Sequence, residues 1–163
     1  MMRKALLPLV LASMLLAGCG PNAGSSEYSL SPEDNARFLA DNGKRPDVKT
    51  LPDGLQIRII NSGHGKKVTS VADVVTVSYK GWTIDNHVFD RTDAGRFATF
   101  EVGKLIPGWT EALKMMREGD EWQIVVPADL SYGVEGAGAD IPPNQTLVFN
   151  MQLLTVKHPE PNW

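Results

Sequence analysis

The sequence has little of what metal centres and disulfide-stabilised scaffolds require. Among its 163 residues the only cysteine is Cys19, so no disulfide can form within the chain and packing alone must hold the core. Its three histidines, His64, His87 and His158, are scattered and lack the spacing of metal ligands. The sequence therefore predicts neither a metal site nor a disulfide framework.

Motifs for phosphate binding and acyl transfer are also missing. Residues 63–67, GHGKK, contain glycines and lysines but lack the full spacing of a phosphate-binding loop, so the expected structure is a turn. No G-x-S-x-G segment is present. With 16 basic against 19 acidic residues, the formal net charge is −3, which argues against nucleic acid as a partner. A set of aromatic residues beside turns is what remains to be explained.

The one long apolar run lies at the N-terminus. A basic start at Arg3-Lys4 precedes an apolar run over residues 5–16, and small residues follow it. This order is typical of a secretory signal peptide, here residues 1–18. The run is too short to make a good bilayer-spanning helix. We therefore expect an exported protein.

The ending Leu16-Ala17-Gly18-Cys19 resembles a bacterial lipobox, in which the cysteine is acylated and becomes the first residue of the mature protein. A lone cysteine in an exported chain fits that role, and an ordinary secreted protein with a free thiol is the alternative. The resemblance implies that Cys19 carries a lipid anchor in the membrane. Because Gly20 rather than an aspartate follows, we expect the periplasmic face of the outer membrane.

Residues 19–46 are predicted to form an acylated, flexible tether that contains one short helix. Residues 20–31 are rich in Gly, Ser, Pro and Asn, as flexible linkers are. Ser31 can cap a helix that has Pro32 at its first position and Asp34 at its third. Asn42-Gly43 can end this helix. Because so short a helix is marginal alone, it must either dock on the main domain or fray.

Residues 47–163 are predicted to form one α+β domain. Their strands should pair into an antiparallel sheet with one face in water, and a single helix at residues 109–119 should cover the other face. That helix places Trp109, Ala112, Leu113 and Met116 on one stripe and ends at Gly119. Alternating apolar and polar residues predict about five strands, at residues 55–60, 74–82, 98–103, 121–126 and 146–156.

Several motifs follow one another in order along residues 53–156: VTVSYKGW, VFD, the long stretch from FEVGKLIPGW to LSYG, and IPPNQTLVF. They closely resemble the FKBP family of peptidyl-prolyl cis-trans isomerases. Residues 35–56 are similar to exported bacterial members of the macrophage infectivity potentiator type. The resemblance implies an antiparallel half-barrel wrapped around the helix, with a pocket between them. A long helical arm makes the dimer in that subgroup, and only about 30 residues separate Cys19 from the domain, so we expect a monomer.

The resemblance also implies which residues form the pocket. Trp109 should be its floor, although from the sequence alone a core tryptophan is an equally good interpretation. Ala98 stands where the family often has phenylalanine, and the adjacent Phe97 should point to the other face of the strand, so a thinner wall is expected there. The implied catalytic residues are Tyr79, Phe89, Asp90, Trp109, Tyr132 and Phe149, and the implied substrate-binding residues are Leu105, Ile106, Ile141 and Ala98.

The activity implied by the resemblance is rotation about X-Pro bonds, which assists the folding of exported proteins in the cell envelope. No bond is made or broken in that reaction, so no nucleophile, metal or cofactor is needed. Proline-containing polypeptides are the expected partners, together with the macrolide inhibitors of the family. Two alternatives stay open: a periplasmic chaperone or proline-binding module whose isomerase rate is incidental, and a lipid-anchored envelope scaffold.

Overall fold

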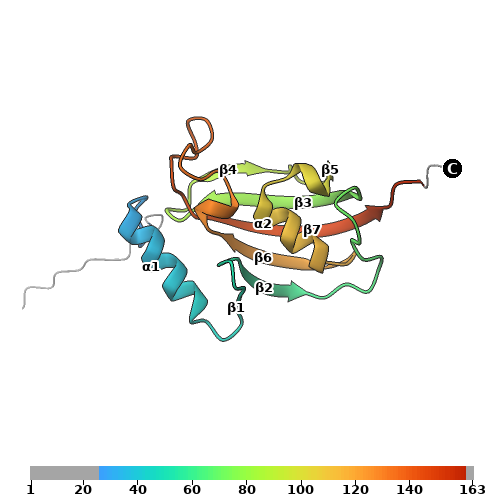
Figure 1. The fold of residues 1–163 in the computed structure, drawn as a ribbon, viewed down its shortest axis with the longest axis horizontal. Helices are drawn as coiled ribbons and strands as arrows, with labels where there is room; N and C mark the ends of the chain where they lie inside the picture. The colour runs from blue at the N-terminus through green and yellow to red at the C-terminus, as the bar shows by residue number, and fades with distance from the viewer. Residues whose placement is uncertain (1–25, 161–163) are drawn as a thin grey trace, which may run out of the picture.

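The structure, a computed structural model, describes residues 26–160 (Figure 1). The predicted signal peptide and Cys19 lie outside the described residues. The helices are α1 (Pro32–Gly43) and α2 (Pro107–Met115), with single 3-10 turns at Val102–Lys104 and Ala128–Leu130. The strands are β1 (Lys49–Thr50), β2 (Gln56–Asn61), β3 (Val74–Thr83), β4 (Val88–Arg91), β5 (Ala98–Glu101), β6 (Glu121–Val126) and β7 (Leu147–Lys157).

All strand pairs described in the sheet are antiparallel, in the order β1-β2-β6-β7-β3-β4, and β5 pairs with β3 beside β4. The sheet curves behind α2, which crosses its inner face (Figure 1). The predicted α+β half-barrel around one helix is therefore confirmed. Two short strands were not anticipated, because β1 and β4 have only two and four residues and show no alternation to read.

The predicted apolar stripe of α2 meets the inner face of the sheet. Trp109, Ala112, Leu113 and Met116 are all buried. Facing them are the inward residues of the long strands, whose side chains alternate with more exposed ones along β3. Burial of each such large side chain stabilises the fold by about 1.5–3 kcal/mol. The buried sheet residues include Val75, Val77, Ile124, Val126, Leu147, Phe149, Met151 and Leu153.

The predicted end of α2 at Gly119 is wrong. The helix ends at Met115, and Met116 is already extended at φ −85° and ψ 160°. Its carbonyl accepts a hydrogen bond from the Val68 N–H, so the chain joins another loop instead of continuing the helix. Gly119, at φ +94°, instead serves the turn before β6, in a backbone conformation that suits glycine.

The strand predicted at residues 98–103 also stops early. β5 ends at Glu101, because a 3-10 turn begins at Val102. The Val102 N–H donates to the Asp73 carbonyl at 3.0 Å, outside the strand ladder. This turn leads the chain from the edge of the sheet to the start of α2.

The N-terminal helix α1 docks on the domain. As predicted, Ser31 caps it: the Ser31 hydroxyl accepts from the Asp34 N–H at 3.1 Å, and Pro32 is at the first position. Two asparagines of α1 bond to the domain, Asn35 to Thr146 just before β7 and Asn42 to Gln56 of β2. The helix therefore lies against one end of the sheet (Figure 1). No helix within residues 26–160 is long and apolar enough to span a bilayer.

Candidate active site

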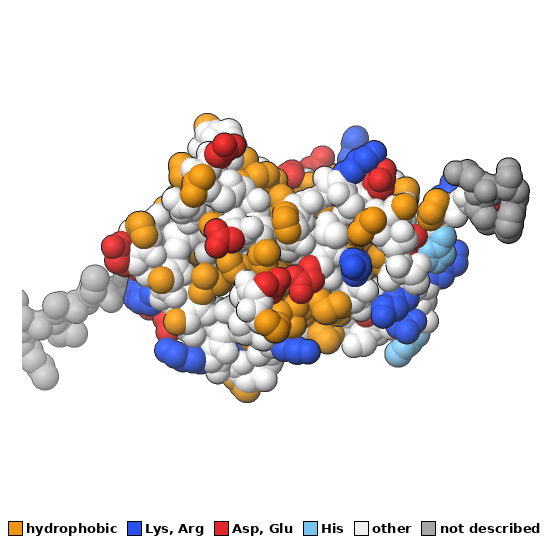
Figure 2. Space-filling model, in the orientation of Figure 1, with side chains coloured by type: hydrophobic (Ala, Val, Ile, Leu, Met, Phe, Trp, Pro, Cys, Tyr) orange, Lys and Arg blue, Asp and Glu red, His pale blue; other side chains and the backbone are white. Residues whose placement is uncertain are grey.

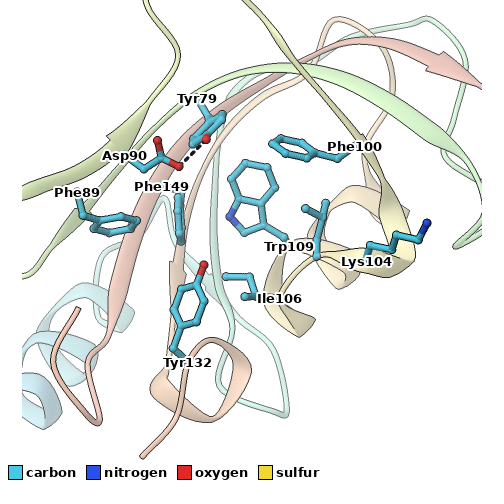
Figure 3. Close-up of a pocket in the computed structure, with 10 residues that line it drawn as sticks. Tyr79, Phe89, Asp90, Phe100, Lys104, Ile106, Trp109, Tyr132 and Phe149 are labelled. Carbon is cyan, nitrogen blue, oxygen red and sulfur yellow. Dashed lines mark hydrogen bonds between the residues drawn. The ribbon is translucent and has the colours of Figure 1, made fainter. Parts of the chain in front are cut away.

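A cavity of about 300 Å³ opens between α2 and the β3–β4–β5 side of the sheet. Its wall is mostly aromatic and apolar, with one carboxylate and one ammonium group at the rim. Figure 3 shows these side chains converging from separate strands and loops. The lining residues are Tyr79, Phe89, Asp90, Phe100, Lys104, Leu105, Ile106, Trp109, Tyr132 and Phe149.

Trp109 forms the floor of this cavity and is also part of the core. Its indole contacts three aromatic rings edge to face, with centroid distances of 5.1 Å to Tyr79, 5.3 Å to Phe149 and 6.1 Å to Phe100. Such perpendicular pairs are favourable beyond the area they bury. The buried indole nitrogen has no hydrogen-bond partner within residues 26–160, and Figure 3 shows it on the side of Phe149. The Trp109 side chain thus belongs to the core and to the pocket at once.

Gly81 makes the aromatic packing possible and was not singled out from the sequence. It lies opposite Phe149 in the pairing of β3 with β7. A Cβ atom at this position would come within 2.7 Å of the Phe149 ring and 2.8 Å of the Phe89 ring. Without it, these two rings meet edge to face at 5.6 Å. A glycine inside a strand was the signal available, because it marks a close approach.

Tyr79 and Asp90 form the polar part of the wall. The Tyr79 hydroxyl donates to Asp90 Oδ2 at 2.6 Å, and the other Asp90 oxygen accepts from the Arg91 N–H at 2.8 Å. Burial, together with this bond and the charge of Asp90, raises the pKa of the Tyr79 phenol. Tyr79 therefore stays a neutral donor, and its hydroxyl is already directed at Asp90.

Ile106 sits where the chain enters α2. Its carbonyl accepts from the N–H groups of Trp109 and Thr110 at 3.0 and 3.1 Å, which begins the helix. Pro107, fixed in φ, is the first helical residue. Within residues 26–160 the Ile106 N–H itself makes no hydrogen bond to the protein. A donor beside an apolar cavity is thus left for another molecule.

Tyr132 reaches the cavity from the loop after the 3-10 turn at Ala128–Leu130. The residue is 41% exposed, and Figure 3 shows its hydroxyl directed towards Phe149 and Trp109. Tyr132 therefore closes the cavity from the side opposite Phe100.

Eight of the ten residues inferred from the sequence line the cavity: Tyr79, Phe89, Asp90, Leu105, Ile106, Trp109, Tyr132 and Phe149. The structure does not bring the other two to its wall. Ile141 is buried and bridges to Ala137 within its own loop. Ala98 is half-buried against the core opposite Val77. Its neighbour Phe97 is 59% exposed and also lies outside the lining.

Phe100 and Lys104 were missed. For Phe100 the signal available was the alternation along the strand predicted at residues 98–103, which places residues 98 and 100 on one face. Lys104 carried no sequence signal, since a lone charged residue usually belongs to a solvated surface. In the described residues no cluster of three or more His, Cys, Asp or Glu side chains is arranged to hold a metal.

Comparison with known proteins matches residues 65–154 to the profile described as FKBP-type peptidyl-prolyl cis-trans isomerase. That match covers more than half of the chain. The chain belongs to the FKBP-type peptidyl-prolyl cis-trans isomerase family. The FKBP resemblance read from the motifs is thereby confirmed.

Two relatives in the FKBP family are similar to this chain over most of its length. "Outer membrane protein MIP" of Legionella longbeachae is 46% identical over 138 residues, which is 82% of this chain and 59% of that protein. "FKBP-type 22 kDa peptidyl-prolyl cis-trans isomerase" of Escherichia coli is 44% identical over 124 residues, 76% of this chain and 60% of that protein. The chain thus spans about 60% of the length of these relatives. Similarity to the macrophage infectivity potentiator type is confirmed as well.

Solved structures agree with the FKBP fold. A peptidyl-prolyl cis-trans isomerase from Pseudomonas syringae superposes with a TM-score of 0.72 at 35% identity, covering 77% of this chain and 92% of that one. FkpA from Escherichia coli also gives 0.72, at 37% identity, covering 77% of this chain and 58% of that one.

Proposed function

We propose that this protein catalyses cis-trans rotation about X-Pro bonds in polypeptides. The observation that carries the proposal is the aromatic cavity with the uncommitted Ile106 N–H at its edge. An apolar slot suits a proline ring, and the N–H suits a carbonyl of the same polypeptide. Membership of the FKBP family supports this activity.

The reaction needs a surface that prefers a twisted amide to a planar one. The barrier to rotation is about 18–20 kcal/mol and arises from amide resonance. Water bound to the carbonyl oxygen favours the planar form, so removing that water lowers the barrier. We infer that Tyr79, Phe89, Trp109 and Phe149 form the slot that does so. A thousandfold acceleration corresponds to only about 4 kcal/mol, which differential binding can supply.

Polar groups around the slot hold the chain on either side of the proline. The Ile106 N–H and the Tyr132 hydroxyl are placed to donate hydrogen bonds to the carbonyls that flank the proline. Asp90 fixes the Tyr79 hydroxyl at 2.6 Å and sets a negative potential at the rim. Since Ala98 lies off the lining, we infer that Phe100 supplies the aromatic wall and Leu105 the adjacent apolar edge.

The experiment that tests the proposed activity is a protease-free proline-isomerisation assay on residues 26–163. The uncatalysed step takes about tens to hundreds of seconds, so acceleration is easily resolved. We expect the cis-trans relaxation to quicken and a macrolide inhibitor of the FKBP family to block it. A peptide that binds but relaxes at the uncatalysed rate would instead identify a proline-binding module.

We further propose that the protein is a lipoprotein of the cell envelope, anchored through Cys19 to the periplasmic face of the outer membrane. The Leu16-Ala17-Gly18-Cys19 ending and the lack of any other cysteine support this. Replacing Cys19→Ser should release the protein from membranes or leave it unprocessed. An unmodified thiol in the intact mass of the mature protein from its native envelope would refute the anchor.

We also propose that the protein is a monomer. The polar side chains Asn35 and Asn42 of α1 bond to the domain that follows them in the same chain. The helix is thus engaged within its own chain. Residues 26–163 should sediment as a monomer at micromolar concentration, and a concentration-independent dimer in analytical ultracentrifugation would reject this.

A further inference from the structure

The buried side-chain amide of Asn35 joins α1 to the residues just before β7. Asn35 is one of the few buried polar residues, and both ends of its side chain are hydrogen-bonded. Its amide nitrogen donates to the Ser31 carbonyl at 2.9 Å and to Gln145 Oε1 at 3.1 Å. Its amide oxygen accepts from the Thr146 N–H at 2.7 Å. Two of these three bonds cross from α1 to residues that precede β7.

Gln145 completes the junction from the other side. It is also buried, and its amide nitrogen donates to the carbonyls of Leu30 and Pro143 at 3.1 and 3.0 Å. The two amides therefore tie the start of α1 to residues 143–146 reciprocally. Removing either partner would leave a buried polar group unsatisfied, which makes this junction rigid while it is intact.

Residues 143–146 form the C-terminal end of the loop that carries Tyr132, and we call them the stem of this loop. The Asn144 N–H donates to the Gly133 carbonyl at 2.8 Å, so the stem is bonded directly to the neighbour of Tyr132. Three glycines lie between Tyr132 and this stem and have positive φ: Gly133, Gly136 and Gly138. Glycine-rich backbone has many accessible conformations, so the position of Tyr132 depends on how this stem is held.

The segment before α1 is attached to the neighbouring β3–β4 connection. The Ser26 hydroxyl donates to the Ile84 carbonyl at 2.8 Å. Ile84 lies between β3 and β4, shortly before Phe89. Figure 1 shows α1 beside both the β3–β4 connection and the start of β7. The N-terminal segment thus contacts both connections that lead into the pocket wall.

We propose that Asn35 is a positioning residue for isomerisation: acting through Gln145 and Thr146, it holds the loop so that the Tyr132 hydroxyl meets the substrate. This inference rests on the proposed function and assigns α1 a role in catalysis. Asn35 touches no substrate. It restricts the conformations of a loop whose tyrosine does, and small displacements of such a group reduce catalysis strongly.

The matched control is Asn42 in the same helix. Its amide nitrogen donates to Gln56 Oε1 at 2.7 Å, on β2, and not to residues 143–146. Asn35→Ala and Asn42→Ala thus each remove an asparagine that bonds α1 to the domain. Both are made in the full chain and compared where urea titration shows them folded. We expect Asn35→Ala to lower kcat/KM about two- to tenfold, the effect of one hydrogen bond, and Asn42→Ala to leave it unchanged.

Amide exchange gives a readout that does not depend on activity. The Asn144 N–H should exchange faster in Asn35→Ala than in wild type or Asn42→Ala. Unchanged exchange there would overturn the inference, even if the wild-type protein were inactive. Absence of any acceleration by wild type would instead overturn the proposed function. The two failures are therefore distinguishable.

A double-mutant cycle tests whether Asn35 acts through the Tyr132 hydroxyl. In a Tyr132→Phe background, Asn35→Ala should cause little further loss of kcat/KM, because the group that it positions is already gone. If the two losses multiply, or if Asn42→Ala lowers kcat/KM as much as Asn35→Ala does, Asn35 is only a structural residue and the inference is wrong.

Discussion

Two carboxylates near the opposite ends of β3 differ in surroundings more than in chemistry. Asp73, just before the strand, has a side chain only 1% exposed. It accepts from the N–H groups of Thr69 and Ser70 at 2.7 and 3.0 Å and contacts His158 Nδ1 at 2.9 Å. Burial alone would raise its pKa, but the bonds from His158 and these amides hold the pKa of Asp73 below its usual value.

Asp90, paired with Gly81 near the other end of β3, is exposed. It bonds to Tyr79 and to one backbone N–H, and it faces an apolar cavity on one side. Asp73 ties the end of β7 to the loop before β3, and its oxygens are surrounded by protein. The comparison indicates that Asp73 serves the fold and Asp90 serves the pocket. The two roles predict opposite effects of mutation on stability and on catalysis.

The largest effect is expected at Trp109, which belongs to both the core and the pocket. Trp109→Ala removes a buried core side chain and the cavity floor, so it should lower stability by about 3–5 kcal/mol and abolish isomerisation. Leu113→Ala is the matched control, because Leu113 is buried on the same helix face and lies outside the cavity lining. Urea unfolding and isomerisation rates should show Leu113→Ala destabilised but active where folded. Equal residual rates in the two variants would contradict the floor assignment.

Asp73→Asn should come next, and its effect should be confined to stability. The substitution removes a charge that accepts two backbone hydrogen bonds in a buried site, so a loss of about 1.5–3 kcal/mol is expected. Because Asp73 is not one of the residues that line the cavity, kcat/KM should be unchanged in the folded variant. A lowered kcat/KM without destabilisation would reverse the roles assigned to the two carboxylates.

Acid titration sharpens the same prediction. Because the pKa of Asp73 is lower in the folded state, its stabilisation is fully present above the unfolded value of about 3.9. It is lost as the pH falls through the folded pKa. Urea unfolding of wild type and Asp73→Asn should therefore differ most above about pH 5 and converge in more acid solution. A difference that stays constant from neutral to acid pH would rule out the Asp73 charge as its source.

Tyr132→Phe should have the smallest effect of these substitutions. It keeps an exposed ring and removes one hydroxyl, so stability should hardly change. Transition-state binding should weaken by about 0.5–1.5 kcal/mol, a several-fold loss of kcat/KM. Steady-state isomerisation with a proline peptide measures it, and a wild-type rate would remove Tyr132 from the proposed mechanism.

Much of this molecule was predictable because its strongest signals are local. The stripe from Trp109 to Met116 and the alternation along β7 each place side chains within one element, and both are observed. The pocket motifs add spacing that is specific to the FKBP family. By contrast, β4 is too short to show a period, and the end of α2 depends on a hydrogen bond from the Val68 N–H.

Contacts between distant parts of the sequence were beyond such patterns. Asn35 and Gln145 are 110 positions apart, and no local sequence pattern near either residue indicates their contact. Ile141, by contrast, was wrongly expected in the pocket. Its motif suggested the pocket wall, but the fold of its loop places it in the core. Lys104 reaches the cavity only because the 3-10 turn brings it there.

The most direct test of the central claim is the kcat/KM of Asp90→Val, measured together with its urea stability. Asp90 is exposed, so stability should change by less than about 0.5 kcal/mol. Loss of the carboxylate frees the Tyr79 hydroxyl and removes the negative potential at the rim, so kcat/KM should fall about two- to tenfold. A folded Asp90→Val that isomerises proline peptides at the wild-type rate would show that Asp90 has no part in catalysis.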